Sequence, residues 1–435
     1  MTKIHTQNAP DISVVKPHFL FGAVAFAVAV ILMMLADAEL LNHYSHPKIA
    51  AIVHVNLLGW AMMLIYGSLY QLVPVVFETK LFSEKLAKLT FWITGFSVFL
   101  MAWSFWSGKL TDWLVWSAYL IYTGLLLFVI NIGLTYKSAT IKNIKNYFII
   151  AAIFWLLFAQ TEGLLMAMNF RYGFLGEPVT YHIKIHASAG LVGFFLQMIF
   201  GVGTTLIPMF LVSHKHSEKP LCPSFLLLNA GVGVATLSWL YLPASWHRIT
   251  TVTGWILVVA GIMFYVRFVY QAYRLRFKRI LDEGMEPTML MFITLFIPVF
   301  LSGWLVFTGN PAGRIAVTVT SLLIFSMIFG VINLIIMGQT YKTIPFIIWL
   351  EKYQPYVGKY KIPLPRQIYN ARFALWQYRL YLLAVAGLFA GIVLKNLAVT
   401  RLSIYLLAVV AAMYNYNTFK MFFHKPDLKP LDTKK

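Results

Sequence analysis

The sequence predicts an all-α membrane protein whose twelve transmembrane helices form three pseudo-equivalent arcs of four helices. The first observation is composition, since 60% of the 435 residues are hydrophobic and only 11% are charged. Soluble domains are about half apolar and about a quarter charged, so most of this chain is expected to lie in a lipid bilayer. The second observation is a series of long apolar runs, and the third is a short phrase that recurs in three of them.

The apolar runs are long enough to cross a membrane. About 20 helical residues span a hydrocarbon core of about 30 Å, and twelve runs of roughly that length occur. They cover residues 19–37, 50–76, 88–107, 113–135, 147–169, 179–212, 223–243, 250–273, 288–308, 314–341, 374–394 and 402–423. Because the connections between them are mostly short, we expect residues 1–435 to form a single integral membrane domain.

Basic residues predict the orientation of the spans. Most of the 35 Lys and Arg residues lie in the two tails and in the connections that follow even-numbered spans. By the positive-inside rule, both termini are cytoplasmic, and the protein is expected in the inner (cytoplasmic) cell membrane. This topology accounts for the formal net charge of +20, so we do not expect a nucleic acid partner.

A glycine followed seven residues later by a proline marks the inner end of the second, sixth and tenth spans. The pairs are Gly67 with Pro74, Gly201 with Pro208, and Gly338 with Pro345. Glycine allows a neighbouring helix to approach closely, and proline ends regular hydrogen bonding near the membrane surface. Both residues are also common at helix ends in general, but equal spacing in every fourth helix favours a structural repeat. The predicted arcs are residues 1–145, 146–287 and 288–435.

Three of the eleven histidines lie within predicted spans, all near the outer side. An imidazole in hydrocarbon is costly unless it faces the bundle interior, so His54, His182 and His186 are candidate functional residues. The i,i+4 spacing places His182 and His186 on one helix face, where they could ligate one metal ion. An alternative for His182, which follows Tyr181, is an interfacial position among lipid headgroups. His54 stands 20 residues before its proline and His186 stands 22, which predicts different positions on their helices.

Glu162 is the clearest acidic residue inside a predicted span. It lies in the outer half of the fifth span, at a depth similar to that of the histidines. A carboxylate there could orient an imidazole, ligate a metal or carry protons. The alternative is a neutral carboxylic acid that hydrogen-bonds to a neighbouring helix.

The chain resembles subunit I of the haem-copper oxidase superfamily in its twelve helices, three arcs and histidines on helices 2 and 6. The local sequence is most similar to divergent cytochrome c and quinol oxidase polypeptide I proteins and to haem-copper membrane proteins of the nitric-oxide response. The segments that carry the resemblance are residues 54–60, 70–74, 186–190, 207–210 and 341–346.

The resemblance implies a site that transfers electrons to oxygen or nitric oxide. His54 would be a haem ligand, His186 with His182 would ligate copper or a second haem, and Glu162 would be the catalytic, proton-handling carboxylate. A small electron-donor protein or quinol and partner subunits would join the lipid bilayer as partners.

The chain departs from the oxidase pattern in two spans. In that family helix 10 supplies a ligand to each haem and helix 7 supplies a histidine pair to copper, but the corresponding spans here contain no histidine. The third Gly and Pro phrase also contains no histidine, and Gln339 and Thr340 stand directly before its tyrosine. A complete cofactor set is therefore not expected, and the open alternative is a cofactor-poor relative that acts as a transporter, an assembly subunit or a nitric-oxide sensor.

Overall fold

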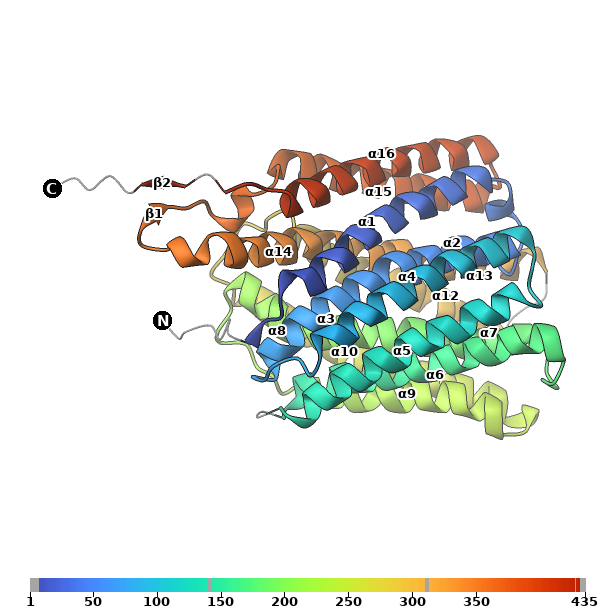
Figure 1. Ribbon diagram of the computed structural model, residues 1–435. Helices are drawn as coiled ribbons and strands as arrows, with labels where there is room; N and C mark the ends of the chain where they lie inside the picture. The colour runs from blue at the N-terminus through green and yellow to red at the C-terminus, as the bar shows by residue number, and fades with distance from the viewer. Residues whose placement is uncertain (1–7, 140–141, 310–312, 427, 431–435) are drawn as a thin grey trace.

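The computed structural model describes residues 8–139, 142–309, 313–426 and 428–430, and helices make up most of it (Figure 1). In this part of the chain, 12 helical spans are long and apolar enough to cross a membrane, which confirms the predicted fold class. The spans are α1 (Ile12–Leu35); α2 (Pro47–His54) with η3 (Val55–Met62) and α3 (Met63–Val76); α4 (Glu84–Ser107); α5 (Trp113–Lys137); α6 (Ile144–Tyr172); α7 (Val179–Ser188) with η4 (Ala189–Leu196) and α8 (Gln197–Leu211); α9 (Leu221–Tyr241); α10 (Ala244–Arg274); α11 (Met285–Thr294) with α12 (Phe296–Phe307); α13 (Arg314–Phe325) with η5 (Ser326–Ile332) and α14 (Asn333–Lys352); α15 (Ala371–Leu394); and α16 (Leu397–Phe422).

Short elements occupy the connections. Three are 3-10 turns, namely η2 (Glu39–Leu41), η6 (Gln354–Tyr356) and η7 (Pro365–Gln367). Two strands of two residues each, β1 (Tyr360–Lys361) and β2 (Lys429–Pro430), pair antiparallel and join the connection after α14 to the segment after α16. They lie beyond the end of the helical bundle (Figure 1).

Several helices extend beyond the apolar runs that predicted them. Helix α1 begins at Ile12 rather than at residue 19, because the side chain of Asp11 accepts a hydrogen bond from the Ser13 backbone N–H (2.8 Å) and caps the helix. The proline lies inside the helix in all three phrases, since α3 continues to Val76, α8 to Leu211 and α14 to Lys352, so the expectation that proline ends the helix is wrong. Hydropathy detects only the apolar part of such helices.

The three spans that contain the Gly and Pro phrase share a π-helical stretch. The stretches η3, η4 and η5 begin at Val55, Ala189 and Ser326, each twelve residues before the glycine of its phrase. A π-helix has a wider turn than an α-helix and is frequent at functional sites. Neither composition nor periodicity predicts these stretches, although their equal spacing agrees with a threefold repeat.

Each phrase glycine contacts the helix that comes before it in the chain. A Cβ atom on Gly67 would lie 3.0 Å from the Cβ of His18 in α1, and one on Gly201 would lie 3.0 Å from the Cβ of Phe148 in α6. A Cβ on Gly338 would lie 2.5 Å from the carbonyl oxygen of Gly284, at the start of α11. The sequence-based explanation, that glycine permits close helix packing, is confirmed at all three positions.

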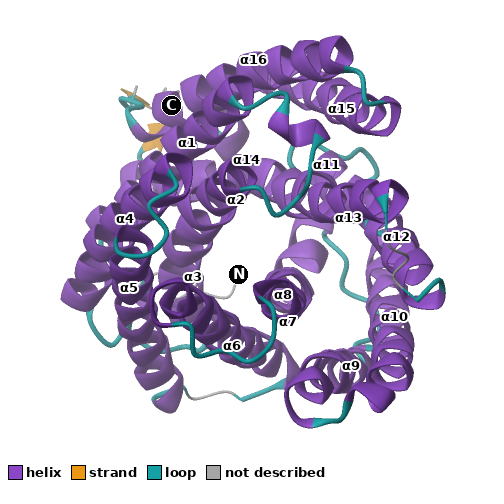
Figure 2. Cartoon of the chain, turned by 90° about the vertical axis from the view of Figure 1, so that its right-hand side faces the viewer, coloured by secondary structure: helices purple, strands orange, loops and turns teal. Residues whose placement is uncertain are grey.

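The repeated spans are the most buried ones. In the apolar windows of the second, sixth and tenth spans, 67%, 61% and 56% of residues are buried, against at most 50% in any other described span. Seen from one end of the bundle, the helices form a closed ring, with α8 toward its middle and α4, α5, α9, α10, α12, α15 and α16 around the outside (Figure 2). The side chains of the repeated spans therefore line the interior.

Candidate functional site

A cavity of about 410 Å³ lies among α2, α4, α5, α6, α7, η4 and α13. It occupies the end of the bundle at which α2 begins, which is the predicted outer end (right in Figure 1). Most of its lining is aliphatic, aromatic or methionine, and the imidazoles of His54 and His186 and the amide of Gln160 are polar exceptions. We call it the histidine cavity. Ligand sites in proteins commonly combine such an apolar lining with a few polar groups.

His54 is the last residue of α2, directly before the π-helical stretch η3. Its Nδ1 atom hydrogen-bonds the carbonyl oxygen of Ala50, one turn earlier (2.8 Å). On one side its ring stacks on Phe105 of α4, with 5.3 Å between the ring centres and 29° between the planes. Because the carbonyl is an acceptor, Nδ1 carries the proton and the Nε2 lone pair is left for a ligand.

His186 lies in α7 and is held by α6. Its Nδ1 atom hydrogen-bonds the carbonyl oxygen of Ala159 (2.7 Å), so its Nε2 lone pair is also left for a ligand. The ring packs directly over Gly163, where an added Cβ would lie 3.1 Å from the imidazole Cε1. Gly163 is thus part of the site, since a side chain there would displace the imidazole.

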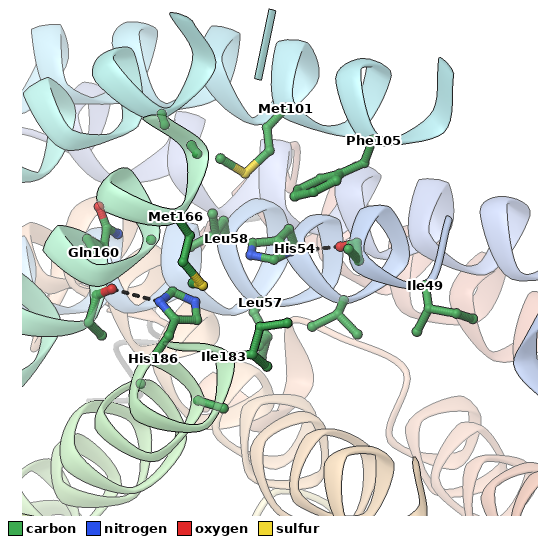
Figure 3. A pocket seen from close by; sticks show the side chains of 18 of the residues that line it. Ile49, His54, Leu57, Leu58, Met101, Phe105, Gln160, Met166, Ile183 and His186 are labelled. Atoms are coloured by element: carbon green, nitrogen blue, oxygen red, sulfur yellow. Dashed lines mark hydrogen bonds between the residues drawn. The ribbon is translucent and has the colours of Figure 1, made fainter. Parts of the chain in front are cut away.

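The two imidazoles face each other across the cavity (Figure 3). Their ring centres are 6.2 Å apart and their planes differ by 25°. Among the described residues, no hydrogen bond to either Nε2 atom is found. Metal-bound histidines almost always donate their other N–H to a carbonyl or carboxylate, which is the arrangement that both rings have here.

His182 has a different partner from His186. Its Nδ1 atom lies 3.1 Å from Oε2 of Glu162, and the two side chains are only 9% and 7% exposed. This burial does not fit an interfacial position for His182. Glu162 therefore contacts an imidazole of a neighbouring helix, which agrees with an orienting role and equally with the alternative of a hydrogen-bonded neutral acid, and His182 is not among the residues that line the histidine cavity. The described residues contain no cluster of three His, Cys, Asp or Glu side chains placed to hold a metal ion.

The tenth span contributes no imidazole to the cavity. It lines the cavity with Ser321, Ile324, Phe325 and Ile328 from α13 and η5. Gln339, where the sequence departs from the oxidase pattern, lies further along the span and donates a hydrogen bond from Nε2 to Oγ1 of Thr288 (2.7 Å). The third repeated span therefore forms part of the cavity wall but supplies no imidazole to it.

An ion pair stands beside the outer end of the histidine cavity. Lys48 follows the lining residue Pro47, and its Nζ atom lies 2.5 Å from Oε1 of Glu39 in η2. The hydrogen bond from Lys48 lowers the pKa of the Glu39 carboxyl below its ordinary value. Tyr44 and Ser45 add hydroxyl groups to the same part of the lining. This end of the cavity therefore offers polar contacts to a ligand whose body lies in the apolar part.

Sequence reasoning found both imidazoles of the cavity but missed the groups that hold them. The carbonyl oxygens of Ala50 and Ala159 and the ring of Phe105 position His54 and His186. The position of Ala50, one helical turn before His54, was a usable signal for the first contact. The second contact crosses from α7 to α6, so no pattern within one segment could indicate it.

Comparisons with known proteins identify the fold. No known family and no curated protein matches the sequence. Among solved structures, the chain is similar to a haem-copper terminal oxidase that was determined as a dimer by cryo-electron microscopy. The TM-score is 0.67 and the sequence identity 9%, over 97% of this chain and 87% of the oxidase chain. The class of protein is therefore a multi-pass membrane protein with the fold of a haem-copper terminal oxidase.

Proposed function

We propose that this protein is a membrane haem protein in which His54 and His186 are the two ligands of one haem. One observation carries the proposal, namely two imidazoles that face each other in an apolar cavity, with both Nδ1 atoms bonded to carbonyl oxygens. Burial among apolar side chains suits a porphyrin, and the hydroxyl groups of the lining residues Tyr44 and Ser45 suit its carboxylates. Because two imidazoles would ligate the iron, bound haem would supply electron transfer to oxygen or nitric oxide without holding either molecule on the iron.

Copper fits the described residues less well than haem. A copper site of the oxidase kind needs several imidazoles around one point, but His182 is bonded to Glu162 and only His54 and His186 line the cavity. The proposed cofactor set is therefore haem without a second metal at this position. The alternative is the predicted metal site, in which His182 and His186 would ligate one metal ion. Metal analysis of the purified protein would have to support it.

Glu162 and His182 are proposed to handle protons beside the haem. The buried carboxylate and imidazole form a hydrogen-bonded pair, a contact through which a proton could pass. Glu162 precedes Gly163, the residue over which His186 packs, so the pair stands next to the proposed haem ligand. Reduction of oxygen or nitric oxide consumes protons, and this pair would supply them from the outer side.

Visible spectroscopy and metal analysis of the purified protein test the haem assignment. Cells supplied with haem should yield protein with about one iron per chain and a Soret band. His54→Ala and His186→Ala should each lose or shift that band, because each removes one of the two imidazoles. His247→Ala is the matched control, since His247 is a half-buried histidine that does not line the cavity and whose Nε2 bonds the carbonyl of Leu242 (3.0 Å).

A folded wild-type protein without haem would refute the proposal, as would a normal spectrum in both cavity variants. Copper that stays at one equivalent per chain through purification, and is lost in His182→Ala, would restore the metal-pair alternative.

Location and partners belong to the same proposal. A multi-pass protein of this fold would lie in the inner cell membrane with both termini cytoplasmic, as the basic residues predict. A small electron-donor protein or a quinol would deliver electrons, and partner subunits would bind within the membrane.

Transport of a small solute is the second candidate function, and one observation favours it. A second cavity lies on the other side of Phe195, whose side chain lines both cavities. Movement of this ring would join them into a route through the bundle. In proteoliposome swelling assays with glycerol, a transporter would give a wild-type rate above that of empty vesicles and a faster rate in Phe195→Ala.

A further inference from the structure

The second cavity has a volume of about 330 Å³ and lies between the inner halves of the three repeated spans. Its lining comes mainly from α3, α8 and α14, with contributions from η4 and η5. Phe195 separates it from the histidine cavity. We call it the inner cavity. Its volume is within the range of about 300–1,000 Å³ that is typical of ligand sites.

The polarity of the inner cavity changes along its depth. Its three main helices run in the same direction, so higher residue numbers in each lie closer to the predicted cytoplasmic end. The deep end, next to Phe195, is lined by Leu64, Met198 and Ile332, which are entirely apolar. Polar residues appear further along each helix, beginning one turn after Leu64, and they are Ser68, Gln71, Thr205, Gln339, Thr340, Lys342 and Thr343. Such a gradient suits a molecule that is apolar at one end and polar at the other.

The polar end of the inner cavity carries an excess of positive charge. The Nζ atom of Lys342 lies 4.9 Å from the ring centre of Phe210, which also lines the cavity. Lys342 forms an ion pair with Asp282, in the connection between α10 and α11, and Lys278 pairs with the same carboxylate. The neighbouring Glu283 is paired with Arg366, so three cations surround two carboxylates and the cluster keeps a net charge of +1. A negatively charged head group would balance it at short range.

One hydrogen-bonding atom in this part of the cavity has no partner. Oε1 of Gln339 is buried and accepts no hydrogen bond among the described residues, although Nε2 of the same side chain is bonded to Thr288. A buried acceptor without a donor costs about 1–3 kcal/mol. An ionised carboxylate has no hydrogen to donate to this oxygen, so Lys342 rather than Gln339 would bind the negative end of a head group.

From these observations we infer that the inner cavity binds a single-chain anionic amphiphile, with its chain toward Phe195 and its head group at Lys342. The ligand is a fatty acid or one chain of an anionic lipid, since both offer an acyl chain and a negative head. The inference does not rest on haem, because none of the residues that carry it is a proposed haem ligand.

Photolabelling tests the inference with a defined probe. The protein, in nanodiscs of zwitterionic phosphatidylcholine, is exposed to a twelve-carbon carboxylic acid with a diazirine at the end of its chain. Labels are expected on the deep lining around Phe195 and Met198. Unlabelled laurate should compete, whereas dodecyltrimethylammonium of equal chain length should not, since its head group has the opposite charge.

Two pairs of variants separate charge from packing. Lys342→Gln should reduce labelling at least about tenfold, while Lys342→Arg should retain it. Lys352→Gln is the matched control on the same helix, because Lys352 bonds the carbonyl of His424 and does not line the cavity. Val202→Trp should fill the cavity and abolish labelling, and thermal unfolding of each variant should show that it is folded.

Several outcomes would overturn the inference. One is labelling that is distributed over lipid-facing side chains, as a bulk bilayer would produce. Another is an equal loss of labelling in Lys342→Gln and Lys352→Gln. His54→Ala should label normally, so a failure of the haem proposal leaves this test intact. Native mass spectrometry of protein taken from its membrane distinguishes the sources, because a fatty acid and a diacyl lipid add different masses.

Discussion

The first two repeated spans and the third share a backbone but differ in chemistry. In all three, a π-helical stretch begins twelve residues before a glycine that contacts the preceding helix. In the first two, an imidazole stands one or three residues ahead of that stretch, at His54 and His186. In the third, the corresponding place before η5 holds Phe325. The comparison teaches that the repeat fixes the scaffold, whereas the ligands are local additions to it.

Replacing the phrase glycines should produce the largest effect. Gly67→Leu, Gly201→Leu and Gly338→Leu each force a side chain into a neighbouring helix at 2.5–3.0 Å. Overpacking of this kind costs about 1–3 kcal/mol, and we expect the upper end of that range because backbone or Cβ atoms are in the way. Thermal unfolding in detergent would measure the loss.

Gly133→Leu is the control for these substitutions, since no atom lies within 4 Å of a Cβ added at that exposed position of α5. Similar losses in the three phrase variants, with none in the control, would establish the repeat as a packing device. If Gly338→Leu caused no loss of stability, the third span would not be equivalent to the first two.

The contribution of sequence to this comparison has a clear physical limit. The spans, the glycine contacts and the different registers of His54 and His186 follow from local patterns, and the structure confirms them. The π-helical stretches do not, because no residue type specifies them. The i,i+4 spacing placed His182 beside His186, but α6 meets the two rings at different points, with Glu162 at one and Ala159 at the other.

Removing the carboxylate at Glu162 should separate its structural role from its proposed chemical one. Glu162→Leu leaves Nδ1 of His182 buried without a partner, which should cost about 1–3 kcal/mol in thermal or chemical unfolding. Glu162→Gln retains an acceptor oxygen and should cost less. If the pair carries protons, the Gln variant should keep its haem spectrum but consume oxygen or nitric oxide at least about tenfold more slowly.

Equal activity of wild type and Glu162→Gln would assign the carboxylate to structure alone. Loss of the haem band in the Gln variant would instead mean that the pair positions His186 and its cavity.

Adding an imidazole to the third span should make it resemble the first. Phe325 is the counterpart of His54, precedes η5 and lines the histidine cavity. In haem-free protein, Phe325→His places a third imidazole near His54 and His186, and zinc affinity should rise at least about tenfold. Leu322→His is the matched control, because Leu322 lies on the same helix but not on the cavity wall, and its distance from η5 matches neither that of His54 from η3 nor that of His186 from η4. Calorimetric titration with zinc would measure the difference, and equal affinities in both variants would show that the spans are not equivalent.

Acid should affect the third span through Asp282, and this is the smallest effect. Burial alone would raise the pKa of Asp282, but hydrogen bonds from Lys278 and Lys342 outweigh it and bring the pKa down to about 2. A folded-state pKa below the ordinary value of 3.8 means that the ionised carboxylate stabilises the fold above about pH 4. That contribution is lost as the pH falls from about 4 through about 2. The first two phrases have no such ion pair at their glycines among the described residues. Unfolding temperatures measured across this window should therefore fall less in Asp282→Asn than in wild type, and parallel curves would show that the pair contributes nothing to stability.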